Sequence, residues 1–530
     1  MLRSALFVYR IAPNNVRLFS ARYANVANTI EIYTDLGNAR PFGFAYDERM
    51  LAHDCPYDST MAEKPERMKL IYERLVKEKQ LEKAVNIPAR PATDEELALN
   101  HPLELVKELE ELKTPEQCED YCRDKEILWL GPRSMEAARL AAGASIDLVN
   151  ASVEGRIGNG FAIVRPPGHH AYGKTPQGYC VFNNVAVAAK YAVEKLGLEK
   201  VAIVDFDIHP ANGTLPSVRD DSRLHLTSFH AYHHGAFWPF EREYDYDTKK
   251  EQIFFPLNGA MNTEGDYLSA FHHVLLPVLK EWKPDMILIS AGFDAGYCDI
   301  MLDMGQSVKA HGYGHMARQL AEVAPGRTLA ILEGGYFPHN YVESAHMMVK
   351  GLQNAPLPAV DYPSLVQGPL REIILNNIHH HAQHWQCMRD KLQRVQQQQK
   401  RLGLAEYTPS SRLFLGHGIR DYWNMVKEMR AVRTREWFPP LDEATTQASI
   451  DKIDAVKKAY DYSKPCPTPA EGTLMEQLIW DEKARADSYI KSAPASLCMY
   501  NEFYDFLSGK IPNMMICDRT ILAEKAGKKL

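Results

Sequence analysis

The sequence predicts an α/β fold: an open, mostly parallel sheet with helices on both faces, followed by a mainly helical C-terminal extension. Three observations predict it. Between about residues 42 and 351, short apolar runs alternate with helical stretches. The apolar runs are continuous rather than alternating with polar residues, as expected for strands buried on both faces. Polar and glycine-rich residues follow these runs directly, so they should meet where the carboxyl ends of parallel strands share one edge.

Four apolar runs predict the central strands, and the stretches between and after them predict helices. The strands are expected at Gly160–Val164, Lys200–Val204, Asp285–Ile289 and Thr328–Leu332. The helices are expected at Asn184–Lys195, Gly265–Trp282, Gly312–Val323 and Asn340–Leu352. Beyond Gly351 the strand signal fades, and Leu370–Arg401 predicts one long helix. The rest is expected to be helical and loop-like, with proline-rich breaks at residues 438–440 and 464–469.

Length and composition limit the classes of protein to consider. At 530 residues the chain is too long for one ordinary core. We expect a targeting segment or a disordered N-terminus at 1–30, a catalytic domain at 38–395 and a C-terminal extension of unknown role at 396–530. No run of eighteen uncharged apolar residues occurs, so no membrane-spanning helix is predicted. The formal net charge of -7 gives no global basic field, so direct binding to nucleic acid is not expected.

The N-terminus and the cysteines bear on the compartment. The first 30 residues contain four arginines and no Asp, Glu or Lys. This composition is typical of a mitochondrial transit peptide, with processing near Arg17–Ser20, although a disordered terminus without a targeting role fits equally well. The nine cysteines are odd in number and form no CxxC pair. They predict neither a disulfide framework nor a zinc finger, and a reducing compartment is the expectation.

A carboxylate-rich segment predicts a metal site. Asp205-Phe-Asp-Ile-His209 follows a buried strand, and a period of two places Asp205, Asp207 and His209 on one face. Two of them can ligate one ion, and Asp294 can supply a third ligand. An Asp₂His set without a fourth protein ligand leaves a position open, as in catalytic sites. Zinc fits this set, and Fe(II) or Co(II) would also be accepted. The alternative is a polar strand end held by hydrogen bonds.

Two further segments reach the same edge of the predicted sheet. Arg165-Pro-Pro-Gly-His-His170 presents His169 and His170 after a rigid turn, where one imidazole can take a proton from water and return it to a leaving group. Glu333-Gly-Gly-Tyr336 places a phenol on a glycine turn, where its O–H can donate to a developing oxyanion. Alone, Tyr336 would be read as an ordinary core tyrosine.

The sequence contains six motifs in this order: RPPGHH, GYCVFNN, DFDIHPANGT, SFHAY, SAGFDA and LEGGY. Through these motifs the sequence resembles the zinc-dependent histone deacetylase family, in particular its class II branch. The resemblance covers about residues 42–385. It implies an arginase/deacetylase-like fold and zinc-dependent hydrolysis of the acetyl amide of N6-acetyl-lysine in histones or other proteins. The substrates would then be the protein partners, with further partners for the C-terminal extension.

The resemblance also implies roles for individual residues. Asp207, His209 and Asp294 would hold one Zn²⁺, and Tyr336 would polarise the carbonyl. His170 would be the main general base and acid beside His169, with Asp205 orienting His169 and Asn212 orienting His170. The substrate chain would pass between the residues Gly178, Tyr179 and Trp238. A K⁺ ion would be bound by the residues Asp205, Ser228 and Phe229, with His230 in the same segment.

Two departures from the family pattern leave alternatives open. Pro210-Ala211 stands where the family has His-Gly, which puts the geometry of His209 in doubt. The loop after Asp294 is longer than usual, so the substrate-gating residue is one of Met301, Leu302 and Asp303. An acidic gate would favour acetylpolyamines, and an altered site would favour a catalytically weak scaffold. The family resemblance predicts nucleus and/or cytoplasm, whereas the N-terminus predicts mitochondria.

Two other clusters predict no site. His379-His-His-x-x-His384 has no acidic ligands nearby and is read as helix packing and surface exposure. Cys118 and Cys122 lack a second pair and are read as ordinary thiols.

Overall fold

In the computed structural model, the described residues are 40–59, 61–235, 237–259, 262–296, 299, 306–360, 362, 366, 368–409, 414 and 478. Several predictions lie outside these residues: the segment at 1–30, the candidate gate residues Met301, Leu302 and Asp303, and the proline-rich breaks. None of the described helices is long and apolar enough to span a membrane.

One parallel sheet forms the centre of the described structure, as predicted. It has eight strands in the order β2-β1-β3-β8-β7-β4-β5-β6. Every pair of neighbours is parallel. The strands are β1 (Gly43–Ala45), β2 (Val85–Asn86), β3 (Gly160–Ala162), β4 (Val201–Asp205), β5 (Leu224–Ala231), β6 (Gln252–Leu257), β7 (Met286–Ala291) and β8 (Thr328–Leu332). All residues of β4, β7 and β8 are buried, which explains their continuous apolar runs.

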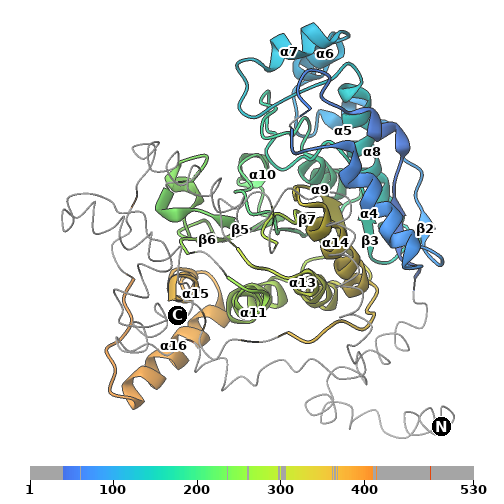
Figure 1. Cartoon of the computed structure of the whole chain (residues 1–530). Helices are drawn as coiled ribbons and strands as arrows, with labels where there is room; N and C mark the ends of the chain where they lie inside the picture. The colour runs from blue at the N-terminus through green and yellow to red at the C-terminus, as the bar shows by residue number, and fades with distance from the viewer. Residues whose placement is uncertain are drawn as a thin grey trace, which may run out of the picture.

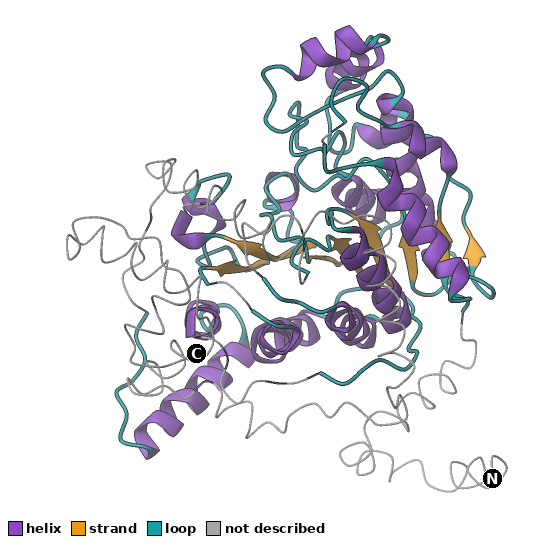
Figure 2. Cartoon of the chain, in the orientation of Figure 1, coloured by secondary structure: helices purple, strands orange, loops and turns teal. Residues whose placement is uncertain are grey.

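Helices lie on both faces of this sheet (Figures 1 and 2). Those before β6 are α4 (Pro65–Lys77), α5 (Asp94–Leu97), α6 (Leu103–Glu110), α7 (Pro115–Cys122), α8 (Ser134–Val153), α9 (Asn184–Glu194) and α10 (Thr214–Val218), with 3-10 turns η1 (Glu48–Ala52), η2 (His233–Gly235) and η3 (Arg242–Tyr244). Those after β6 are α11 (Glu264–Ala270), η4 (Phe271–Leu275), α12 (Leu276–Trp282), α13 (Ala310–Val323), α14 (Pro338–Leu352), α15 (Gly368–His381) and α16 (Gln386–Arg401). Helices α8 and α9 cover one face, and α11, α13 and α15 cover the other (Figure 1).

The long helix predicted for residues 370–401 is wrong, because the chain turns between α15 and α16. The cause is a distant side chain. The carboxylate of Glu281 accepts hydrogen bonds from the backbone N–H groups of Gln386 (2.9 Å) and Cys387 (2.8 Å), and so satisfies the first turn of α16. Trp385 at the turn is buried. Because this capping carboxylate is 105 residues away from the start of α16, the local sequence does not indicate that a new helix begins there.

The helix predicted for residues 265–282 is present with one irregularity. Its middle, η4, is a π-turn in which the N–H of Leu276 donates to the carbonyl of Phe271. Pro277 follows directly and has no N–H to give to the preceding turn. A local π-turn accommodates this loss without ending the helix.

Candidate active site

The carboxyl ends of β3, β4, β7 and β8 lead into the segments that the sequence singles out. Strand β4 ends at Asp205, so Asp207 and His209 lie in the following loop and not on a strand face. The expected period of two is therefore wrong for them. In its place, the N–H of Asp207 donates to Asp205 Oδ1 and the N–H of His209 donates to Asp207 Oδ1, both at 2.9 Å. These side-chain turns fold the loop and bring both residues to the edge of the sheet.

Three side chains form a candidate metal group. The ligand atoms of Asp207, His209 and Asp294 all lie within 4.8 Å of one another. Nδ1 of His209 lies 2.9 Å from Asp207 Oδ1 and 3.0 Å from Asp294 Oδ2. Burial disfavours the charged imidazole, but the two carboxylates outweigh it and raise the pKa of His209 to about 10. Two buried carboxylates that converge on one ring nitrogen concentrate negative charge, which a divalent cation would balance.

Backbone groups hold the two carboxylates of this group. The N–H of Gly334 donates to Asp207 Oδ2 (3.0 Å), and the N–H of Ile208 donates to Asp294 Oδ1 (2.9 Å). A Cβ at Gly292 would lie 2.2 Å from Asp207 Oδ2, and one at Gly334 would lie 2.4 Å from the same atom. The glycines of both motifs therefore leave room for the candidate ligands.

The histidine pair lies beside the metal group with both rings fixed. Nδ1 of His169 lies 3.0 Å from Asp205 Oδ2, and Nδ1 of His170 lies 2.6 Å from Asn212 Oδ1. The two rings are 3.9 Å apart, and the His170 ring stands edge-on to His209 at 5.6 Å. Burial opposes the charged form of His169, but Asp207 and Asp205 outweigh it and raise its pKa well above the usual value. Burial together with its cationic neighbours holds the pKa of His170 well below the usual value.

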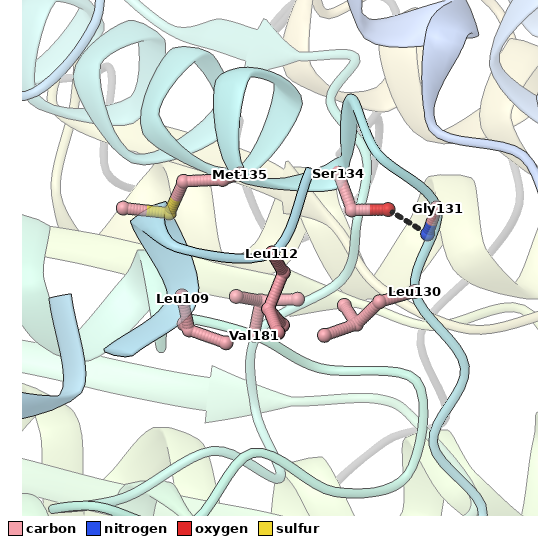
Figure 3. Close-up of a pocket in the computed structure, with 7 residues that line it drawn as sticks. All are labelled: Leu109, Leu112, Leu130, Gly131, Ser134, Met135 and Val181. Carbon is pink, nitrogen blue, oxygen red and sulfur yellow. Dashed lines mark hydrogen bonds between the residues drawn. The ribbon is translucent and has the colours of Figure 1, made fainter. Parts of the chain in front are cut away.

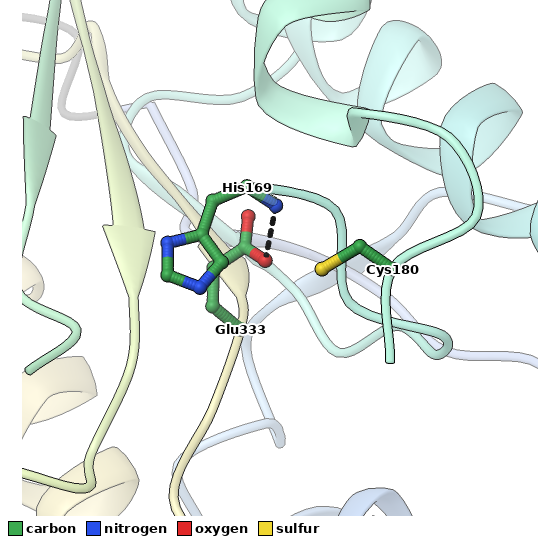
Figure 4. A group of neighbouring side chains, drawn as sticks. All are labelled: His169, Cys180 and Glu333. Atoms are coloured by element: carbon green, nitrogen blue, oxygen red, sulfur yellow. Dashed lines mark hydrogen bonds between the residues drawn. The ribbon is translucent and has the colours of Figure 1, made fainter. Parts of the chain in front are cut away.

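Glu333, for which no role was predicted, supports the histidine loop. Its Oε2 accepts hydrogen bonds from the N–H groups of Gly168 (2.6 Å) and His169 (3.1 Å), as Figure 4 shows for His169. Burial raises the pKa of Glu333 to about 7. Cys180, His169 and Glu333 are also close enough to share an ion. However, the Cys180 sulfur accepts from the N–H of His170 (3.4 Å), and the other two are already engaged, so we interpret this group as packing around the loop.

Tyr336 is held by residues that the sequence analysis missed. Asp299 is buried and accepts hydrogen bonds from the N–H groups of Tyr336 (2.9 Å) and Phe337 (3.1 Å). Arg67 donates through Nε to the carbonyl of Gly335 (2.6 Å), and its guanidinium lies 5.0 Å from the Tyr336 ring centroid. Burial raises the pKa of Tyr336 well above its usual value, so the phenol keeps its proton. The turn has Gly335 at φ +107, a conformation that favours glycine.

A buried carboxylate links the Tyr336 turn to the histidine segment. Glu63 accepts hydrogen bonds from Arg67 Nη1 (2.9 Å) and from Arg165 Nε (2.8 Å) and Nη2 (2.6 Å). All three side chains are almost completely inaccessible to solvent. Burial would raise the pKa of Glu63, but Arg165, His53 and Arg67 outweigh it and hold the pKa well below its usual value. One carboxylate therefore joins the supports of two predicted catalytic segments.

Aromatic rings surround the candidate centre. The Trp238 ring stands perpendicular to His170 at 4.9 Å, and Tyr179 lies 5.8 Å from Tyr336. Gly178 has φ +56, and a Cβ there would meet His170 Cδ2 at 2.4 Å, so glycine is needed at this position. Phe237, which the sequence analysis did not single out, lies 5.9 Å from His209.

The predicted potassium residues lie on adjacent strands. Asp205 pairs with Ser228 in the register of β4 and β5, and both are buried. The Ser228 hydroxyl lies 2.9 Å from His230 Nδ1, and Phe229 stacks on Phe255. Binding of K⁺ stays a prediction.

The Pro210-Ala211 departure does not separate the predicted ligands. Neither residue has a positive φ, and Ala211 is buried in the core. The N–H of Leu215 donates to the Ala211 carbonyl (2.9 Å) at the start of α10. A glycine is therefore not required at residue 211.

The remaining clusters lie apart from this centre. Among the described residues, the His379–His384 cluster forms no metal group, and Nε2 of His380 contacts the carbonyl of Thr248 (2.9 Å). Cys118 and Cys122 are free, buried thiols. A small pocket near α6 and the start of α8 is lined by Leu109, Leu112, Leu130, Gly131, Ser134, Met135 and Val181 (Figure 3). This lining contains no charged side chain.

The described domain is a parallel α/β fold. At one edge of its sheet lie an Asp₂His group, an oriented histidine pair and a buried phenol. These features are typical of proteins that carry out metal-assisted hydrolysis. The chain belongs to the histone deacetylase family: the family's histone deacetylase domain matches residues 61–352, more than half of the chain.

Relatives and a solved structure agree with this assignment. The chain is 35% identical over 356 residues to human "Polyamine deacetylase HDAC10", covering 65% of this chain and 53% of that protein. It is 38% identical over 309 residues to "Histone deacetylase 18" of Arabidopsis thaliana, covering 56% and 45%. The chain thus spans about half the length of these relatives. The structure titled "Crystal Structure of HDA15 HD domain" matches with a TM-score of 0.61 at 30% identity, covering 67% of this chain and 98% of that one.

Proposed function

We propose that this chain hydrolyses the acetyl amide of N6-acetyl-lysine in histones or other proteins, with one zinc ion held by Asp207, His209 and Asp294. The observation that carries the proposal is the position of the His170 ring, 5.6 Å from that of His209 and fixed by Asn212. A proton acceptor thus stands beside a group of ligands that leaves a coordination position open.

The hydrogen bonds assign the protons. Asn212 Oδ1 can only accept, so Nδ1 of His170 carries its hydrogen and Nε2 is left as the base. Zinc bound at the three ligands would lower the pKa of a water molecule and polarise the substrate carbonyl. His170 then takes the proton of the attacking water and later gives it to the leaving amine. As water adds to the carbonyl carbon, the Tyr336 O–H donates to the negative charge that develops on the carbonyl oxygen.

The test is the hydrolysis of an acetyl-lysine peptide by zinc-loaded Tyr336→Phe. We expect a loss of about a hundredfold or more in turnover, because one oxyanion donor is removed. Zinc content should not change, because Tyr336 is not a proposed ligand. Tyr191→Phe, in α9 away from the centre, is the matched control and should keep full activity. Parent-like turnover by Tyr336→Phe would overturn the proposed mechanism.

The names of several relatives, which are polyamine deacetylases, favour a second candidate, an acetylpolyamine amidohydrolase with the same chemistry. A substrate panel separates the two, and preference for acetylspermidine over every acetylated peptide would select the second. Stoichiometric zinc without turnover on any acyl-amine would select a third function, a scaffold that binds partners through residues 396–530.

For the compartment, we propose nucleus and/or cytoplasm, with mitochondria as the alternative. The four arginines of the first 30 residues support the alternative. Imaging a tagged full-length chain beside one that begins at Asn28 tests this. Mitochondrial signal that is lost on truncation would select the alternative.

A further inference from the structure

The loop after β5 has an unusual backbone. This "aromatic loop" comprises residues 233–235 and 237–242. Positive φ angles occur at His233 (47), His234 (56), Gly235 (78) and Phe240 (65). Three of these residues have side chains that disfavour this conformation. Such a backbone persists only where surrounding contacts hold it in place.

The aromatic loop carries two rings that face the candidate centre. Trp238 stands against His170 at 4.9 Å, and Phe237 lies 5.9 Å from His209. Within the catalytic domain, the N–H of His234 donates to Asn258 Oδ1 (2.7 Å), and the N–H of Gly235 donates to the carbonyl of Tyr232 (2.9 Å). The position of this backbone therefore sets the position of the rings.

The C-terminal extension adds a contact that no motif predicts. A Cβ built on Gly235 would lie 2.3 and 2.5 Å from two ring carbons of Phe414, so this ring lies directly against the loop backbone. The guanidinium of Arg242 lies 4.9 Å from the centroid of the same ring. Phe414 therefore touches the loop near both of its ends.

The described residues that follow α16 contact the catalytic domain through Tyr407. The Tyr407 hydroxyl donates to Asn376 Oδ1 of α15 (2.5 Å), and the Tyr407 N–H donates to Gln399 Oε1 of α16 (3.2 Å). Phe414 is itself packed against the main hydrophobic core. These contacts fix the described start of the extension to α15 and α16, and Phe414 adds the contact with the aromatic loop.

We propose that Phe414 is a positioning residue: it holds the aromatic loop so that Trp238 stays against His170, and the extension thereby takes part in substrate binding. The effect on substrate rests on the function proposed above, whereas the effect on the loop does not.

The first experiment measures hydrogen exchange of backbone amides in the full-length protein. Phe414→Ala should speed exchange in peptides that cover residues 231–244, with little change in β4 or β7. Arg242→Gln, an exposed change on the loop side of the contact, should produce a smaller increase in the same peptides. Phe414→Tyr should behave as the parent. Leu402→Ala removes an exposed apolar side chain just after α16 and is the control that should change nothing in the loop.

The second experiment measures steady-state kinetics of zinc-loaded protein on an acetyl-lysine peptide and on acetylspermidine. Phe414→Ala should raise KM several-fold with a smaller change in kcat, because the ring of Trp238 shifts while Asn212 still orients His170. Phe414→Tyr should restore the parent KM.

Unchanged exchange in residues 231–244 of Phe414→Ala would overturn the proposal. Faster exchange spread evenly over the chain would also overturn it, because Phe414 would then support general stability only. The parent protein could show no turnover while Phe414→Ala still speeds hydrogen exchange in residues 231–244. That result would refute the proposed function but would support the positioning role of Phe414.

Discussion

Replacing Glu63 by alanine should destabilise the protein more than a typical single substitution. The change leaves the guanidinium groups of Arg67 and Arg165 buried without their shared carboxylate. Breaking a buried ion pair by removing one partner costs about 3–5 kcal/mol. Glu63→Gln keeps the shape and one oxygen acceptor, so we expect a smaller loss of about 1.5–3 kcal/mol, the value of hydrogen bonds to a charged group.

The assay is urea-induced unfolding of the parent, Glu63→Ala, Glu63→Gln and a control on helix α4, which begins two residues after Glu63. Glu73→Ala is the control, because Glu73 is half-exposed and 3.8 Å from Lys69. Surface pairs of this kind contribute about 0–1 kcal/mol. A loss below about 1 kcal/mol for Glu63→Ala, equal to that of the control, would refute the reasoning that this carboxylate holds the two arginines together.

The pKa of Glu63 also predicts how the free energy of unfolding depends on pH. Because its pKa in the folded protein lies well below the usual value of 4.5, the ionised group contributes stability above that value. This contribution is lost as the pH falls below the usual value toward the folded pKa. The free energy of unfolding of the parent should therefore fall more steeply below about pH 4.5 than that of Glu63→Gln. Parallel curves would contradict the assigned charge state.

Three further predictions follow from the site and the fold. Asp299→Ala leaves the N–H groups of Tyr336 and Phe337 without their acceptor, which should cost about 1–3 kcal/mol in urea unfolding and lower turnover. Asn212→Ala should lower turnover about 10- to 100-fold with unchanged zinc content by elemental analysis, because His170 loses its orienting partner. Chelation of the metal should abolish acetate release and zinc should restore it, whereas full turnover of demonstrably metal-free protein would contradict the assignment of the ligands.

The sequence predicts the parallel sheet and the segments at its edge because both depend on local patterns. The strands β4, β7 and β8 are continuous apolar runs, and each leads into a motif. Strands β1 and β2, of three and two residues, were not predicted. Strand β3 is equally short, but it lies within the longer apolar run Gly160–Val164 and was therefore predicted. Strands β5 and β6 were also missed, and β5 includes the buried polar residues His225 and His230.

The supports of the site were largely invisible in the sequence for a different reason. Glu63 and Arg165 are 102 residues apart, and Arg67 and Gly335 are 268 residues apart. In the sequence Glu63, Arg67 and Arg165 each resemble an ordinary surface charge, and only the fold shows that they are buried and paired. A signal was available for Glu333, since a charged residue directly after a buried strand needs partners.

The strand order has a consequence for synthesis on the ribosome. Strand β8 lies between β3 and β7, so the backbone ladder that joins β2, β1 and β3 to the other four strands depends on the strand that is made last among those described. Until Thr328–Leu332 has left the ribosome, the two parts of the sheet cannot join through β8, and the edges of β3 and β7 remain unpaired. These exposed edges are hazards for aggregation. We therefore expect chaperone dependence to be greatest late in translation, and premature termination before β8 to leave no folded catalytic domain.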